Sequence, residues 1–405
     1  MLQSFSVLRH RHILLLWLGQ LLSAFGDRFF EIAVIWLSVQ IVGSEAGFVL
    51  AAGSTARLLT GLLGGVYADR WDRQKTMIVV DLLRGVAILS LPLAAHLVEI
   101  SLIHLAVVAA IEGALSSLFD PALQAALPHL LDDTQQLQAG NALLDITSRM
   151  ARIFAPGLAG LLITFLPIEQ FFTLDVFTFA ISAIALFAIG REFRWQPVGS
   201  NAHSQGTQGI FQDIRGSFIL LLENKAVFWS ILSYISANIV WAGTIMVGLP
   251  LWVDTELGGG VQGYSFLITA YGIGSVSSNL IVGSTTIRNR SRVLFAGIVV
   301  FGLGIMLLGF SRSYGMALAA MFLAAMGTPM SDLMMLMLIQ KEFPPEQVGK
   351  IYSLRLTIST IGYSLGLLIA AYLFQWMAMP TGILLLGLIT LFVGGAGLIG
   401  IRSFR

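Results

Sequence analysis

Long apolar runs follow one another along the whole chain, and they constrain its fold more than any other feature. A helix needs about 20 apolar residues to cross roughly 30 Å of hydrocarbon. Because lipid offers the backbone no hydrogen-bond partners, runs of that length predict helices rather than the short alternating strands of a barrel. We therefore predict an all-α integral membrane protein with twelve transmembrane helices, near residues 13–41, 46–68, 75–97, 101–127, 139–165, 169–190, 226–253, 261–285, 291–311, 314–340, 349–376 and 380–402.

The composition excludes several classes of protein. Hydrophobic residues make up 56% of the chain and charged residues 11%, and the mean hydropathy is +0.84, so we expect the lipid bilayer to be its surroundings. A net charge of +1 argues against a nucleic-acid partner. The chain has no cysteine, no nucleotide-binding G-x-x-x-x-G-K-[ST] loop and no mid-membrane histidines at ligand spacing. We expect no metal, no cofactor and no ATP-driven transport.

One long polar stretch divides the chain into six helices and six helices. Residues 191–225 contain PVGSNAHSQGTQG, which has too little apolar content to pack. We predict an N-terminal six-helix bundle at 1–190, a cytoplasmic linker at 191–225 and a C-terminal six-helix bundle at 226–405. Two pseudo-symmetric bundles around a central cavity are the usual plan for alternating access.

The distribution of lysine and arginine predicts how the helices are oriented. With twelve crossings and both termini inside the cell, the outer loops receive only Arg312. The inner side receives Arg9, Arg11, Arg70, Arg73, Lys75, Arg191, Arg194, Arg215, Lys225, Arg288, Arg290, Arg292, Lys341, Lys350, Arg402 and Arg405. Because cytoplasmic loops carry the excess of basic residues, this bias supports both the count and the orientation. The N-terminal residues lead straight into the first span, which we expect to be retained.

A charged loop follows the second span, with the sequence GVYADRWDRQK at 65–75. It resembles the signature loop of the major facilitator superfamily, G-x-x-x-D-R-x-x-R-x-K, and lies where that family has it. The resemblance covers the whole chain and implies the major facilitator fold. It also implies a gating motif on the inner side, made of Gly65, Asp69, Arg70, Arg73 and Asp120.

Each part of this motif has a physical reason. Gly65 permits close helix approach, and Asp69 can meet a helix N-terminus. Asp120 lies at the inner end of the fourth helix, where the family has its matching acid. We expect Asp69, Arg73 and Asp120 to form a charge relay that stabilises the outward-open state. The alternative is an ordinary charged loop that obeys the positive-inside bias.

A second resemblance points toward export. Pro156, Gly157 and Gly160 on the fifth helix resemble the G-P-x-x-G motif of the exporter branch of the superfamily, with Ala155 in place of its leading glycine. Proline and small residues bend a helix and permit close packing near a substrate path. Both residue types are also common in membrane helices generally. The arginine motif that many proton-coupled exporters carry on the fourth helix is absent.

Charges within the predicted spans are candidates for proton coupling. A charge at the bilayer centre costs on the order of 3 kcal/mol, so each needs a partner or water. We expect Asp27 and Glu31 to face Arg57, and Glu112 to face Arg152. An acid whose neutralisation frees a basic partner can act as a proton switch. The coupling candidates are Asp27, Glu31, Glu112, Arg57, Arg149 and Arg152, and the alternative is a set of permanent ion pairs that fix helix packing.

Two further pairs are predicted nearer the inner surface. Asp81 with Arg84, and Asp332 with Arg355, are expected to be structural or gating pairs rather than substrate contacts, because their depth does not suit binding.

The second half has few mid-membrane charges and many aromatic and methionine side chains. Such residues can line a pocket for varied lipophilic molecules. Our candidates for a substrate cavity are Trp241, Tyr234, Tyr271, Met330, Met334 and Tyr363. The alternative is packing against lipid and other helices.

Together these features predict an exporter that resembles the macrolide-efflux and siderophore-export group of the superfamily. We expect a monomer in the cell's inner membrane that moves a lipophilic or amphiphilic small molecule outward in exchange for protons. An alternative is a carrier of the same fold for a native metabolite, such as a siderophore or a lysophospholipid. A non-transporting receptor or an intramembrane enzyme is the rival from another class, and an enzyme needs a reactive constellation that the sequence lacks.

Overall fold

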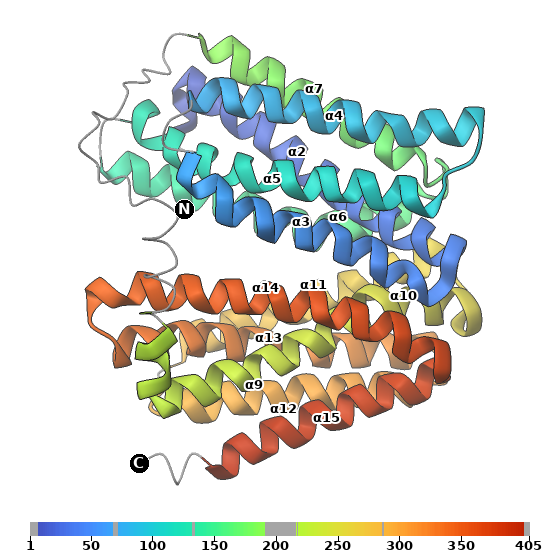
Figure 1. Cartoon of the computed structure of the whole chain (residues 1–405), viewed down its shortest axis with the longest axis vertical. Helices are drawn as coiled ribbons and strands as arrows, with labels where there is room; N and C mark the ends of the chain where they lie inside the picture. The colour runs from blue at the N-terminus through green and yellow to red at the C-terminus, as the bar shows by residue number, and fades with distance from the viewer. Residues whose placement is uncertain are drawn as a thin grey trace. The chain divides into compact units, whose positions relative to one another are not determined.

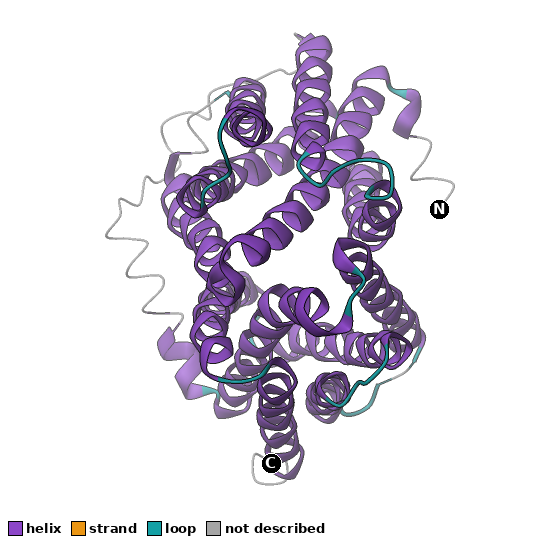
Figure 2. Ribbon diagram, turned by 90° about the vertical axis from the view of Figure 1, so that its right-hand side faces the viewer, coloured by secondary structure: helices purple, strands orange, loops and turns teal. Residues whose placement is uncertain are grey.

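The computed structural model of the chain describes residues 7–67, 72–131, 134–190, 216, 218–285 and 287–400. Across these ranges the regular elements are helices, joined by short loops (Figure 2). The prediction of an all-α membrane fold is confirmed.

The helices of the first half match the predicted runs closely. They are η1 (Val7–Arg9), α2 (Arg11–Val42), η2 (Gly43–Glu45), α3 (Ala46–Tyr67), α4 (Arg73–Leu97), α5 (Leu102–Leu130), α6 (Thr134–Leu162) and α7 (Gln170–Ile189). Side-chain caps fix where two of them begin. The Asp72 carboxylate accepts from the Lys75 amide at 3.1 Å, and the Ser101 hydroxyl accepts from the His104 amide at 3.2 Å.

The second half begins with a helix whose geometry changes along its length. The single predicted run at 226–253 forms α9 (Lys225–Trp241), a π-helical segment η5 (Ala242–Gly248), a short α10 (Leu249–Trp252) and a second π-helical segment η6 (Val253–Leu257). The remaining helices are α11 (Gly260–Ser284), α12 (Arg290–Gly309), α13 (Tyr314–Glu342), α14 (Pro345–Trp376) and α15 (Met379–Gly400). Wide π turns often occur at functional sites.

A run of three glycines connects η6 to α11. Gly258, Gly259 and Gly260 have φ angles of 66°, 112° and 55°. These values lie in the left-handed region, which side chains with a Cβ rarely adopt. The reversal of chain direction at this point therefore depends on glycine at three successive positions.

The contacts divide the chain into two units. Unit 1 contains Met1–Ile41 and Ala52–Ser204, and unit 2 contains Val42–Ala51 and Gln205–Arg405. In unit 1, α4 packs along α5 and α7 (Figure 1). In unit 2, α12 packs on α13 and α15, α11 packs on α13, and α14 packs on α9. The predicted domain limits stay a prediction, and most of the predicted linker lies outside the described residues.

Each unit has its own apolar core. The core of unit 1 includes Leu16, Met77, Phe119, Leu127 and Leu186. The core of unit 2 includes Ile231, Leu294, Ile298, Met335 and Leu338. Many other large apolar side chains point outward from the helices, as the exposure of Phe187, Leu280 and Phe392 shows. An exposed apolar surface of this kind is stable when lipid covers it.

Ten helical stretches of the described chain are long and apolar enough to cross a membrane. The first is Arg11–Gly61, which contains both α2 and most of α3 because the two helices continue into each other through η2. The helix α6 is not among the ten, since it carries Asp145, Arg149 and Arg152. The chain is a multi-pass membrane protein, and the count of twelve crossings stays a prediction.

Candidate functional site

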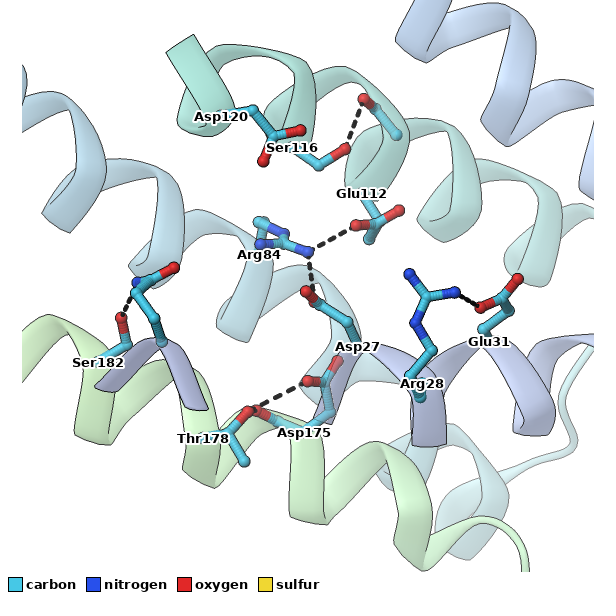
Figure 3. Close-up of polar contacts among 12 residues, drawn as sticks. Asp27, Arg28, Glu31, Arg84, Glu112, Ser116, Asp120, Asp175, Thr178 and Ser182 are labelled. Atoms are coloured by element: carbon cyan, nitrogen blue, oxygen red, sulfur yellow. Dashed lines mark hydrogen bonds and ion pairs between the residues drawn. The ribbon is translucent and has the colours of Figure 1, made fainter. Parts of the chain in front are cut away.

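A buried arginine on α4 holds two acids from neighbouring helices. Arg84 donates one hydrogen bond to Asp27 of α2 and another to Glu112 of α5, each at 2.6 Å (Figure 3). The side chain of Arg84 is 4% exposed, whereas those of Asp27 and Glu112 are 35% and 18% exposed. The two acids therefore connect a buried cation with more accessible surroundings. We call this group, with the two further acids described below, the Arg84 cluster.

The helix α7 supplies an aromatic ring and a third acid to the Arg84 cluster. The guanidinium of Arg84 lies 4.2 Å from the centre of the Phe179 ring, a cation–π contact. Asp175 is fully buried, and one of its oxygens accepts a hydrogen bond from the Thr178 hydroxyl at 3.2 Å. Its other oxygen has no partner among the described residues. Figure 3 shows Asp175 on the same side of Arg84 as Asp27.

A glycine on α2 permits this close approach of α7. A Cβ atom at Gly26 would overlap the side chains of both Asp175 and Thr178. With glycine at this position, the α2 backbone can lie directly against the α7 acid. The adjacent residue Asp27 is then placed within reach of Arg84.

The fourth acid of the Arg84 cluster lies one helical turn before the arginine. Asp81 is fully buried beside Ser182 of α7, and neither of its carboxylate oxygens has a hydrogen-bond partner among the described residues. The Ser182 hydroxyl accepts from the Gln20 amide of α2 at 3.4 Å. Gln20 therefore adds a neutral polar contact at the edge of the cluster.

The balance of charge in the Arg84 cluster is unusual. Four carboxyl groups surround one guanidinium, from Asp27, Asp81, Glu112 and Asp175. Ionised carboxylates lose several kcal/mol each on leaving water unless a cation compensates them. One arginine compensates one acid in full, so the Arg84 cluster holds more carboxyl groups than its cation can balance.

The predicted partners of Asp27 and Glu112 were wrong. Asp27 was expected to face Arg57 and Glu112 to face Arg152, but both acids bind Arg84. The periodicity of a helix shows which residues share a face, but not which neighbouring helix that face meets. Arg84 was expected nearer the inner surface than these two acids, and this was also wrong, because it binds both of them at 2.6 Å and so lies at the same depth.

The other predicted coupling residues form pairs along or between helices. Glu31 pairs with Arg28, three residues earlier on α2. Arg149 donates to Asp145, four residues earlier on α6, at 2.7 Å. Arg152 lies in the electrostatic field of these pairs rather than against Glu112. The side chains of all four paired residues are more than a third exposed.

The predicted gating residues are partly described. Asp120, in the C-terminal half of α5, pairs with Arg57 of α3 at 2.7 Å. Arg73, the first residue of α4, donates to the carbonyl oxygen of Ala125 at 2.6 Å. Gly65 lies in the last turns of α3. Asp69 and Arg70 lie outside the described residues, so the proposed relay stays a prediction.

The predicted exporter motif lies within one continuous helix. Pro156, Gly157 and Gly160 are all inside α6, and Pro156 and Gly160 are buried. Their role in export stays a prediction.

The candidate cavity residues of unit 2 include a connected aromatic group. The Trp241 indole donates to the Tyr271 hydroxyl at 2.8 Å, and Tyr271 lies 3.4 Å from the Thr328 hydroxyl. The ring of Tyr363 lies 6.0 Å from that of Trp241. We call Trp241, Tyr271 and Tyr363 the aromatic group. Its members come from α9, α11 and α14, and each is partly exposed.

An ion pair with an adjoining tyrosine lies in the same unit. Asp332 of α13 pairs with Arg355 of α14, as predicted, and accepts a hydrogen bond from the Tyr234 hydroxyl at 2.7 Å. The guanidinium of Arg355 also lies 4.5 Å from the centre of the Tyr234 ring. Tyr234 therefore contacts Arg355 through its ring and Asp332 through its hydroxyl.

Of the two predicted cavity methionines, one is inaccessible. Met334 is fully buried in the unit 2 core, whereas Met330 is partly exposed. The prediction for Met334 was wrong for this conformation, because its face of α13 meets other helices rather than an open surface.

Among the described residues, no group of three or more histidine, aspartate or glutamate side chains is arranged to hold a metal ion.

The chain resembles a known protein family along nearly its whole length. The model of the family described as "Transmembrane secretion effector" matches residues 2–402. The chain belongs to this family of the major facilitator superfamily. The chain is 23% identical over 361 residues to macrolide efflux protein A of Streptococcus pyogenes, covering 88% of this chain and 87% of the relative. It is 24% identical over 373 residues to the enterobactin exporter EntS of Escherichia coli O1:K1 / APEC, covering 89% and 85%.

Solved structures of other transporters have the same fold as this chain. A nucleoside transporter, NupG, has a TM-score of 0.73 at 13% identity, covering 97% of this chain and 99% of its own. A D-xylose–proton symporter has a TM-score of 0.68 at 14% identity, covering 97% and 96%. The predicted superfamily is confirmed, and the chain is a multi-pass membrane protein of the major facilitator superfamily.

Proposed function

We propose that this protein exports lipophilic or amphiphilic small molecules by proton antiport with alternating access. The observation that carries this proposal is the Arg84 cluster, where four carboxyl groups share one guanidinium. A site with surplus buried acid can hold and release protons, which a permanently balanced ion pair cannot do.

The partial exposure of two acids supports proton exchange at the Arg84 cluster. Glu112 and Asp27 are partly exposed, and both bind the same nitrogen of Arg84. When one of these acids takes a proton, its attraction to Arg84 falls. The guanidinium then pairs with the other acid alone. Because the three residues lie on α5, α2 and α4, the change alters the attraction between three helices of unit 1. This link between protonation and helix packing is the proposed coupling step.

The aromatic group supports a lipophilic or amphiphilic substrate. Trp241, Tyr271 and Tyr363 present ring faces together with polar N–H and O–H groups, and this combination suits molecules with both apolar and polar parts. The relatives named above are a macrolide efflux protein and an enterobactin exporter. The match to the exporter of a siderophore favours a native metabolite as the second candidate substrate.

We further propose that the protein lies in the cytoplasmic membrane, with both termini inside and with Asp69, Arg73 and Asp120 gating the inner face. The bias of lysine and arginine toward one side supports this orientation. The hydrogen bond from Arg73 to the Ala125 carbonyl supports an inner latch, since it ties the start of α4 to the inner end of α5.

Transport into vesicles provides the test. The purified chain is reconstituted into liposomes, and movement of a fluorescent lipophilic dye is followed with and without a pH gradient. Proton antiport predicts that the gradient drives the dye uphill and that substrate movement consumes the gradient, which a pH-sensitive dye reports separately. Equal dye movement with and without the gradient would remove the coupling. No protein-dependent movement of any tested compound would favour a receptor.

A further inference from the structure

A polar pocket lies at one end of unit 2, away from the aromatic group. It is lined by Trp229 of α9, by Arg288, Arg290 and Ser291 around the start of α12, and by Lys341 and Glu342 at the end of α13. Its volume is about 260 Å³. We call it the Arg288 pocket.

The Arg288 pocket has an excess of positive charge. Three of its residues are cations and one is an acid, and Lys341 pairs with Glu342 at 3.0 Å. The side chains of Arg288 and Arg290 make neither a hydrogen bond nor an ion pair with any residue that the structure describes. An arginine presents a planar fork of donors that matches phosphate and carboxylate. Two such forks at one pocket are therefore available to an anion.

The backbone adds donors at the same place. The helix α12 begins at Arg290, and its cap residue Asn289 accepts a hydrogen bond from the Arg292 amide at 3.1 Å. The amides of Arg290 and Ser291 have no partner within the helix, since the first turn of any helix leaves its N–H groups free. These groups and the positive end of the helix dipole favour an anion beside the two arginines.

The flank of the Arg288 pocket is apolar. Phe295 and Leu338 are 3% and 4% exposed and close its floor, whereas Trp229 is 46% exposed at its edge. One turn further along α9, Leu232 is 45% exposed. Tryptophan is enriched where the membrane meets water. An occupant of this pocket can thus place a charged group against the arginines and an apolar chain along α9.

We propose that the Arg288 pocket binds the headgroup of an anionic phospholipid, with the phosphodiester held by Arg288, Arg290 and the start of α12. The combination of unpaired cations, free amides and an adjoining apolar flank matches a lipid phosphate better than a free ion. Basic pockets between membrane helices bind lipid headgroups in this way. The proposal does not depend on which solute is exported.

Lipid retention measures this binding directly. The full chain is purified from nanodiscs that contain phosphatidylcholine with a minor fraction of phosphatidylglycerol, and native mass spectrometry counts the lipids that stay bound. The double variant Arg288→Gln/Arg290→Gln is expected to bind phosphatidylglycerol about 30-fold more weakly, since each cation near an anionic lipid is worth roughly fivefold in affinity. Arg292→Gln is the matched control, because Arg292 lies in the same turn but does not line the pocket.

Two further arms make each outcome decisive. Arg290→Lys keeps the charge and is expected to keep most of the binding, which separates loss of charge from loss of folding. Inorganic phosphate at millimolar concentration is expected not to displace phosphatidylglycerol; displacement would assign the site to a free anion. Equal retention of the two lipids by the natural protein, or equal loss in Arg292→Gln and the double variant, would overturn the proposal.

Discussion

Arg84 and Glu112 are 28 residues apart in the sequence, and their side chains meet at 2.6 Å between α4 and α5. Asp27 of α2 reaches the same guanidinium nitrogen at the same distance. Three helices of unit 1 thus depend on one buried cation. Any change in the charge of either acid must change how strongly these helices attract one another.

Replacing the more buried of these two acids should uncouple transport from protons. Glu112→Gln keeps the shape of the side chain but cannot release a proton, so we expect gradient-driven efflux to fall on the order of tenfold or more while substrate binding is retained. Lowering the external pH should accelerate efflux by the natural protein and have no effect on the variant. Asp145→Asn, which removes an exposed acid outside the Arg84 cluster, should behave like the natural protein. A fully pH-responsive Glu112→Gln would contradict the coupling role.

Removing the shared cation should destabilise unit 1. Arg84→Met leaves four acids without their cation, and breaking a buried pair typically costs about 3–5 kcal/mol. We expect a clear decrease in the Tm of the purified protein in detergent. Arg57→Met is the control, because its pair with Asp120 is more than half exposed and such pairs contribute about 0–1 kcal/mol. Equal Tm values for the two variants would show that Arg84 is not a structural centre.

A methyl group on α2 should disturb the same cluster. Gly26→Ala places a Cβ against Asp175 and Thr178, and overpacking of this kind costs about 1–3 kcal/mol. Gly61→Ala on α3 is the matched control, since its Cβ would meet Ser117 at an ordinary 3.7 Å. We expect the first variant to lower both Tm and proton-driven efflux and the second to change neither. The measurements are thermal unfolding and the vesicle assay.

The aromatic group should contribute to substrate affinity. Trp241→Phe keeps an aromatic ring but removes the hydrogen bond to Tyr271, and such a bond is worth about 0.5–1.5 kcal/mol. We expect substrate to bind several-fold more weakly, as measured by titration of intrinsic or dye fluorescence. Tyr372→Phe, an exposed ring that packs on Phe48 in the same unit, should leave affinity unchanged. Unchanged affinity in Trp241→Phe would place the binding site elsewhere.

The absence of cysteine allows a direct test of orientation. In the variant Thr285→Cys, just after α11, the new thiol should react with an impermeant maleimide from the cytoplasmic side alone. In the variant Arg312→Cys, between α12 and α13, the thiol should react from outside alone. The two positions lie at the opposite ends of α12, so each controls for the other. The reverse pattern of labelling would overturn the predicted topology.

Much of the fold could be predicted from the sequence because the bilayer fixes the length of each apolar run. The run at 169–190, for example, became α7 at Gln170–Ile189. The π turns of η5 and η6 could not be predicted, because the glycines, proline and polar residues within and between them also occur in regular membrane helices and at their ends. Helix windings of this kind depend on neighbouring helices.

The site was predicted less well. Asp27 and Glu112 were recognised from their depth, but Asp175 was missed, although it is the one charged residue in the 20-residue sequence of α7. A lone acid in such a helix is costly, so it was a usable signal. Arg84 was recognised as charged but placed at the wrong depth. The identity of the partners could not be predicted, because that depends on how helices distant in sequence come together.

The three-glycine connection between η6 and α11 has a consequence for engineering. At Gly258, Gly259 and Gly260, replacement by an ordinary amino acid costs about 1–2 kcal/mol of backbone energy at each left-handed position, even where no neighbour is touched. A saturation library over this connection should therefore recover glycine, with asparagine or aspartate as the rare survivors. Directed evolution of new specificity is better aimed at other connections.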